Sequence, residues 1–111
     1  MKPSGRLAKG SIVQLRQRID AVDSRIIRLL EARFAVIESI GRLKAARGFP
    51  VRDAGRMKEV MNTRLASAAA LGLPRAMVKK IYTEIIAHSM RREKKYLKAA
   101  GGKRYGTKKH T

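Results

Sequence analysis

Residues 12–46 read IVQLRQRIDAVDSRIIRLLEARFAVIESIGRLKAA, and this stretch decides the fold. It holds no proline, and its single glycine is Gly41. Apolar residues recur there at alternating steps of four and three, with one position missing, which predicts the apolar face of one long helix. They are Leu15, Ile19, Val22, Ile26, Leu29, Val36, Ile40 and Leu43. We expect Gly48 and Pro50 to end this helix.

A helix of this length is too long for the core of a single copy of the chain. Some 35 residues at about 1.5 Å each make roughly 50 Å. A domain of 111 residues has a diameter of roughly 35 Å. Because the apolar face continues along the whole helix, a second chain must cover the overhang. The sequence therefore predicts a homodimer with paired long helices.

Two shorter helices are predicted after the long one. Asp53 suits the N-cap of the second helix, which we expect to stop at Gly72. Pro74 suits the first turn of the third helix, which we expect Gly101-Gly102 to end. The apolar stripes of these helices are Met57, Val60, Met61 and Leu65, and Val78, Ile81, Tyr82, Ile85 and Ile86. No strand pattern and no repeat accompanies them, so the predicted fold is all-α.

The chain is strongly basic, and part of the charge lies near its ends. The net charge is +19; residues 1–10 hold three Lys/Arg and residues 94–111 hold seven, with no acid in either segment. We interpret residues 1–10 as a basic N-terminal segment, residues 11–100 as one helical domain and residues 101–111 as a solvated basic tail. Such a balance favours anionic partners: nucleic acid, an acidic protein surface or an anionic small molecule.

Composition also excludes several kinds of site. The absence of cysteine excludes disulfides, thiolate zinc sites and cysteine nucleophiles, and two histidines with eight acids predict no metal site. No apolar run approaches the roughly 20 residues that span a bilayer, so we expect no membrane segment. The start of the chain lacks the apolar stretch of a signal peptide. We therefore expect a cytoplasmic protein.

Polar residues interrupt the apolar lines of two predicted helices. Arg33 occupies the missing position of the long helix, and Lys44 follows eleven residues later on nearly the same face. On the third helix, Ser89 and Glu93 continue the line of Ile81 and Ile85. Each has an ordinary explanation: a side chain that reaches the rim, a lysine at a helix end, or a helix that emerges into water. Together they predict a cationic pocket with one carboxyl group, which suits a small polyanion.

Three segments carry a family resemblance: LRQRIDAVDSRIIRLLEAR, IGRLKAARGFPVRD and IYTEIIAHS. They resemble the all-α chorismate mutase family over residues 11–93. The resemblance implies an L-shaped protomer of three helices that intertwines with a second copy. It implies a dicarboxylate substrate with an enolpyruvyl ether and a pericyclic, unimolecular reaction that needs no cofactor, metal or nucleophile.

The resemblance also implies the residues of the site. Those that bind the substrate's carboxylates and ring are Arg16 from the partner copy, Arg33, Lys44, Asp53, Arg56, the residue at Met57, Ser89 and Glu93. Lys44, Glu93 and Arg33 are expected to carry catalysis, with Lys44 facing the ether oxygen, which gains negative charge as the C–O bond stretches. Glu93 stands where many members have glutamine, and it donates to that oxygen only when it is protonated.

Met57 departs from the family pattern and keeps several functions open. Many members carry a glutamate there, which accepts from the C4 hydroxyl of chorismate. Glu59 is two residues away and points about 200° from Met57. The first hypothesis is a chorismate mutase that makes prephenate. The alternatives are an isochorismate-pyruvate lyase, which makes salicylate and pyruvate, a 4-amino-4-deoxychorismate mutase, and a non-enzymatic basic nucleic-acid binder. The basic tails would suit an acidic protein partner.

Overall fold

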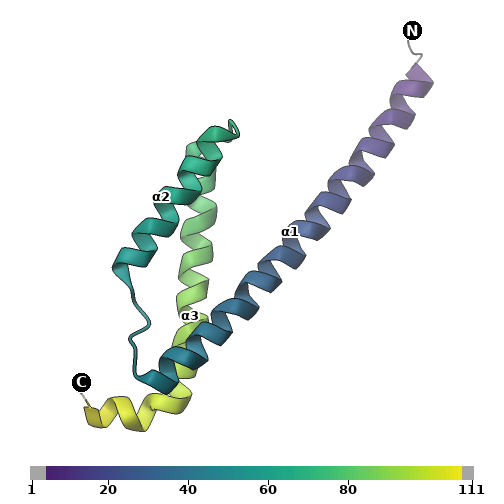
Figure 1. The fold of residues 1–111 in the computed structure, drawn as a ribbon. Helices are drawn as coiled ribbons and strands as arrows, with labels where there is room; N and C mark the ends of the chain where they lie inside the picture. The colour runs from purple at the N-terminus through teal and green to yellow at the C-terminus, as the bar shows by residue number, and fades with distance from the viewer. Residues whose placement is uncertain (1–4, 109–111) are drawn as a thin grey trace. The chain divides into compact units, whose positions relative to one another are not determined.

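The computed structural model describes the backbone of residues 5–108 and the side chains of residues 10–99. Its three helices are α1 (Gly5–Arg47), α2 (Ala54–Ala70) and α3 (Arg75–Lys108), drawn in Figure 1. The described backbone contains no strand, so the all-α fold and its long first helix are confirmed. The chain divides into two units, Met1–Arg33 and Phe34–Thr111, which are described separately below.

The N-terminal unit contains the first part of α1, and its large apolar side chains are exposed in the single chain. The whole of α1 has 43 residues. Within this unit, the exposed fraction is 57% for Ile19 and 66% for Leu29. Other large apolar side chains exposed there are Ile12, Val13, Leu15, Val22, Ile26 and Ile27. Many large apolar side chains exposed on one helix are typical of an interface.

Two glycines end α1 and α2 as predicted, and the backbone shows why. Gly48 and Gly72 have φ angles of +72° and +73°, the left-handed region that favours glycine. The next residue donates back across each turn, from Phe49 N to Lys44 O at 2.9 Å and from Leu73 N to Ala68 O at 2.9 Å. This is the hydrogen-bond pattern of a Schellman motif, which satisfies carbonyls at a helix C-terminus.

Two expectations about α3 were wrong in detail. The helix does not stop at Gly101-Gly102 but continues to Lys108. Glycine costs only about 1 kcal/mol relative to alanine in a helix and keeps its N–H, so it weakens a helix without ending it. Pro74 lies just before the first turn, where its carbonyl accepts from Val78 N at 3.2 Å.

The C-terminal unit has a small core between α2 and α3. Leu65, Ala68 and Val78 form it, with Met61 and Tyr82 packed against them. All of these residues except Ala68 belong to the predicted stripes, so the sequence predicted most of this core. Ile81 departs from the prediction, because it is 46% exposed although its spacing placed it in the stripe of α3. A core this small leaves room for polar contacts to decide how α1 meets α3.

Candidate functional site

An ion pair joins the last turns of α1 to the middle of α3. Lys44 Nζ donates to Glu93 Oε1 at 2.7 Å and to the carbonyl oxygen of Val51 at 2.9 Å. The side chains of Lys44 and Glu93 are 19% and 9% exposed. The α1–α2 loop therefore helps to hold the ammonium group, since Val51 lies in that loop. The structure brings together two residues that lie 49 positions apart in the sequence.

A glycine allows the two helices to come this close. A Cβ atom on Gly41 would lie 3.0 Å from Glu93 Cα and 3.2 Å from Tyr96 Cδ2. The first of these contacts is with backbone, which cannot turn aside as a flexible side chain can. Gly41 is buried, as is Ala45 one turn later. Small residues on α1 thus permit the approach that puts Glu93 beside Lys44.

Ser89 lies one turn before Glu93 and is also buried, at 5% exposure. Its Oγ donates to the carbonyl oxygen of Ile85 at 2.7 Å, a local bond within α3. A serine hydroxyl has a single proton to donate. Ser89 must therefore rotate away from Ile85 before it can donate to a carboxylate.

The predicted residues at the start of α2 have separate local roles. Asp53 is the N-cap, as predicted, and its Oδ1 accepts from Arg56 N at 3.0 Å. Such a cap contributes about 1 kcal/mol. The Arg56 guanidinium is exposed and donates to Glu59 Oε1 at 2.9 Å. Met57 is half-buried. Glu59 is thus held on the exposed side of the helix and does not take the place of Met57.

Two adjoining grooves run along α2 and α3. The first has a volume of about 440 Å³ and is mostly apolar, with Ala54, Met57, Met61, Ile86 and Met90 among its lining residues. The second, of about 360 Å³, shares Arg52, Ala87 and Met90 with the first and adds Arg91 and Lys94. An apolar groove that continues into a cationic one suits a ligand with an apolar body and an anionic group.

Arg16 and Arg33 belong to the N-terminal unit. Arg16 is exposed on α1 and Arg33 is half-buried. Their position relative to Lys44 and Glu93 therefore remains a prediction.

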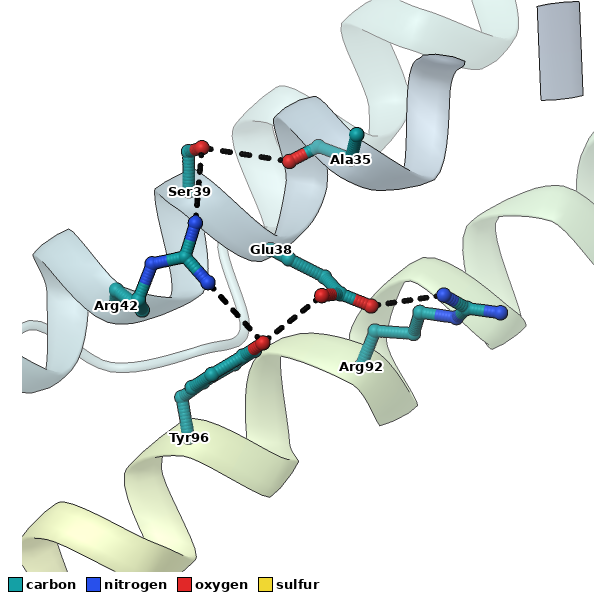
Figure 2. A network of polar contacts seen from close by, with 6 residues as sticks. All are labelled: Ala35, Glu38, Ser39, Arg42, Arg92 and Tyr96. Atoms are coloured by element: carbon teal, nitrogen blue, oxygen red, sulfur yellow. Dashed lines mark hydrogen bonds and ion pairs between the residues drawn. The ribbon is translucent and has the colours of Figure 1, made fainter. Parts of the chain in front are cut away.

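A polar network that the sequence analysis missed links α1 to α3 near the ion pair (Figure 2). Tyr96 Oη donates to Glu38 Oε1 at 2.8 Å and accepts from Arg42 Nη1 at 3.2 Å. Arg92 Nη1 donates to Glu38 Oε2 at 2.8 Å. The guanidinium of Arg92 also lies 4.6 Å from the centre of the Phe34 ring. We call Glu38, Arg42, Arg92 and Tyr96 the clamp. The feature of the sequence that could have pointed to the clamp is Glu38, an acidic residue in a chain rich in lysine and arginine.

The clamp shifts the pKa values of two of its members. The hydrogen bond from Tyr96 lowers the pKa of the Glu38 carboxyl, and the hydrogen bond from Arg92 lowers it further. The same bond to Glu38 raises the pKa of the Tyr96 phenol above its usual range, and desolvation adds to this rise. The two shifts describe one contact, in which a neutral phenol donates to an ionised carboxylate.

Replacing Tyr96 by phenylalanine should lower the thermal unfolding midpoint at neutral pH by roughly 4 °C, because this hydrogen bond is lost. Because the pKa of Glu38 is lowered by folding, the bond stabilises the protein above pH about 4.5, the ordinary pKa of a glutamate. This stabilisation is lost as the pH falls through the folded-state pKa of Glu38. Because the pKa of Tyr96 is raised by folding, the same bond stabilises the protein below pH about 10. This stabilisation is lost as the pH rises through the folded-state pKa of Tyr96. Thermal melts of both proteins across pH should therefore converge at both extremes. A constant difference at every pH would contradict this assignment.

Within the described residues, no group of three or more His, Asp or Glu side chains is placed to hold a metal ion. No described helix is long and apolar enough to cross a membrane. The arrangement around Lys44 instead offers hydrogen-bond donors and positive charge beside one carboxylate. It can bind and orient an anion and stabilise negative charge that develops near Lys44 Nζ.

Comparison with known proteins decides the family. The family model described as chorismate mutase type II matches residues 15–94, which is most of the chain. The chain belongs to the chorismate mutase type II family. This confirms the resemblance found in the sequence. Among the clamp residues, Tyr96 alone lies outside the matched range of this chorismate mutase type II domain.

One curated relative of this chorismate mutase type II domain is the T-protein of Enterobacter agglomerans. It is 27% identical over 78 residues, which cover 70% of this chain. The matched part amounts to 21% of the T-protein, so the chain matches about a fifth of that relative's length. The similarity thus concerns one domain-sized part of the relative.

Proposed function

We propose that the protein is a chorismate mutase, which rearranges chorismate to prephenate in aromatic amino-acid biosynthesis. The observation that carries the proposal is the half-buried Lys44, which Glu93 and the Val51 carbonyl hold in place within a chorismate mutase type II domain. The reaction is a unimolecular bond reorganisation. It requires a site that fixes a compact conformer of a dianion and stabilises charge on one oxygen.

Lys44 is the group that we assign to the ether oxygen of the substrate. Two of its three N–H donors point to Glu93 and Val51, and the third can donate to a ligand. Glu93 accepts from Lys44 in this arrangement, so its proposed role is to orient the ammonium group. Donation from Glu93 itself to the ether oxygen would require a protonated carboxyl group, which is the alternative raised by the sequence.

The carboxylates of the substrate are assigned to Arg33, Arg56, Ser89 and Arg16, the last from a partner copy. Arg56 must leave Glu59, and Ser89 must rotate away from Ile85, to do this. The exposed apolar face of α1 supports the homodimer, since residues such as Leu29 are two-thirds exposed in the single chain. The L-shaped intertwined protomer, the cytoplasmic location and an acidic partner for the basic tails belong to the same proposal.

The proposal is tested by incubating the purified protein with chorismate and identifying the product. Conversion to prephenate with saturation kinetics is the expected result. Parallel incubations with isochorismate and with 4-amino-4-deoxychorismate define the substrate. If chorismate is left unchanged while another of the three is consumed, the assignment to chorismate is wrong.

A second candidate is an isochorismate-pyruvate lyase, and the surroundings of Met57 support it. Met57 is half-buried in the apolar groove with Met61, Ile86 and Met90. Its thioether is a weak acceptor, so it offers little to the C4 hydroxyl of chorismate. Isochorismate has no hydroxyl at C4, so an apolar side chain next to this position does not weaken its binding. The same residue gives no acceptor for the amine of 4-amino-4-deoxychorismate.

Met57→Gln should change the choice between these substrates. The amide supplies an acceptor without placing a charge in the groove, so kcat/KM for chorismate should rise about tenfold, or ~1.4 kcal/mol. The kcat/KM for isochorismate should stay the same or fall. Met57→Leu is the matched control, because it keeps the site apolar and should leave the ratio unchanged. Equal effects of both variants on both substrates would show that residue 57 does not face this part of the substrate.

A further inference from the structure

We infer that Tyr96, through Glu38 and Arg42, is a positioning residue that sets the Lys44–Glu93 pair for catalysis. The inference rests on the proposed function of Lys44, and it adds a residue that lies beyond the range matched by the family model. It does not place Tyr96 in contact with substrate.

The first step of the argument is position. Tyr96 follows Glu93 by three residues on α3, so its side chain lies about one turn further along the same side of the helix. Arg42 precedes Lys44 by two residues on α1. Figure 2 shows the two hydrogen bonds by which Tyr96 joins α3 to α1. By position along the helices, these bonds lie within one or two turns of the ion pair.

The second step is the kind of apolar contact at this crossing, which involves small residues on α1. The Tyr96 ring lies against Gly41, where a Cβ would be 3.2 Å from Cδ2. Ala45 and Leu97 are the buried apolar residues of this part of α1 and α3. Glycine and alanine present a smooth surface along which a helix can slide, because they have no large side chain to interlock. Directional hydrogen bonds are then what fixes the register of α3 on α1.

The third step is the sensitivity of the ion pair to register. Lys44 Nζ and Glu93 Oε1 are 2.7 Å apart, and a hydrogen bond weakens steeply beyond about 3.2 Å. A slide of about 1 Å would change which donor of Lys44 faces the ligand, and misplacement of that size can cost a large part of catalysis. The phenol of Tyr96, which donates to Glu38 and accepts from Arg42, resists such a slide from both sides.

A purely structural bond would behave differently from a positioning one. Loss of a structural bond lowers stability and the amount of folded enzyme, but the molecules that remain folded keep their kcat and KM. Loss of a positioning bond changes kcat in the folded enzyme, and KM changes little, because Lys44 acts mainly in the transition state.

The test compares three variants of the full chain. Tyr96→Phe removes only the phenol oxygen, and Glu38→Gln weakens the same bond from α1. Ser39→Ala is the matched control: Ser39 Oγ accepts from Arg42 at 3.4 Å and donates to the carbonyl oxygen of Ala35 at 3.3 Å, and both of these partners lie on α1. We expect kcat of Tyr96→Phe to fall about tenfold, while its KM stays within about twofold of the wild-type value. Glu38→Gln should show the same change in kcat and KM. Ser39→Ala should have the kcat and KM of the wild type.

A second measurement does not depend on turnover. In the unliganded protein, the 15N signal of the Lys44 ammonium group should be visible, because Glu93 and Val51 slow its exchange with water. It should broaden or vanish in Tyr96→Phe and persist in Ser39→Ala. An unchanged ammonium signal together with an unchanged kcat in folded Tyr96→Phe would overturn the inference. If the wild type converts none of the three candidate substrates, the proposed function fails, and the ammonium signal still decides whether Tyr96 positions Lys44.

Discussion

Replacing Lys44 by methionine is expected to lower kcat/KM for the proposed substrate by about 10²–10³-fold, as removal of one donor to a developing oxyanion does in other enzymes. Methionine keeps the length of the side chain but removes its charge and all three donors. The loss should appear mainly in kcat, because the ether oxygen becomes negative only as the bond breaks.

The difficulty with this variant is that it leaves Glu93, which is 9% exposed, without its cation. An unpaired buried carboxylate destabilises a fold. The matched control is therefore the double variant Lys44→Met with Glu93→Gln, which removes both charges. It should recover most of the lost thermal stability and none of the activity. If it recovers activity together with stability, Lys44 serves the fold rather than the reaction.

Glu93→Gln alone separates the two roles proposed for the carboxyl group. The amide oxygen can still accept from Lys44, and its N–H can donate to the ether oxygen. An orienting role therefore predicts activity within about tenfold of the wild type, since only a hydrogen bond to a charge is weakened. A donor role predicts activity above that of the wild type, because the amide always carries an N–H donor whereas an ionised carboxyl group carries none.

Mixing two inactive variants should restore activity if the site is shared between copies. Arg16→Ala and Arg33→Ala are each expected to lose about 10²-fold or more, because each removes a charged contact to the substrate. In a mixed dimer, one site combines an intact Arg33 with an intact Arg16 from the other copy. Its second site lacks both. Random mixing in equal amounts makes half of the dimers mixed, so about a quarter of the wild-type activity should return.

The mixing experiment needs proof that exchange took place. Native mass spectrometry of a tagged and an untagged variant supplies it, and each variant mixed with itself gives the background. Verified mixed dimers without recovered activity would place Arg16 in the site of its own protomer. Sedimentation of the wild type as an active monomer would remove the dimer altogether, and the exposed apolar face of α1 would then need another explanation.

The helices of this protein were predictable from the sequence because their determinants are local. The spacing of apolar residues marked α1, α2 and α3, and Asp53, Gly48 and Gly72 marked the ends where the backbone needs a cap or a left-handed residue. The end expected at Gly101-Gly102 was wrong because glycine lowers the stability of a helix without preventing it. The family followed from the same local segments.

The tertiary structure alone decided which polar groups meet. Lys44 and Glu93 lie 49 residues apart, and Glu38 and Tyr96 lie 58 apart. The sequence marked Lys44 and Glu93 as polar residues on the apolar lines of their helices, but it did not show that they form an ion pair. Glu38 and Tyr96 are ordinary residues of their own helices, so no local pattern distinguishes them from solvent-exposed neighbours. Their pairing depends on the register between α1 and α3, which the close approach at Gly41 makes possible. Register is set by contacts between distant segments, and it exists only once the chain has folded.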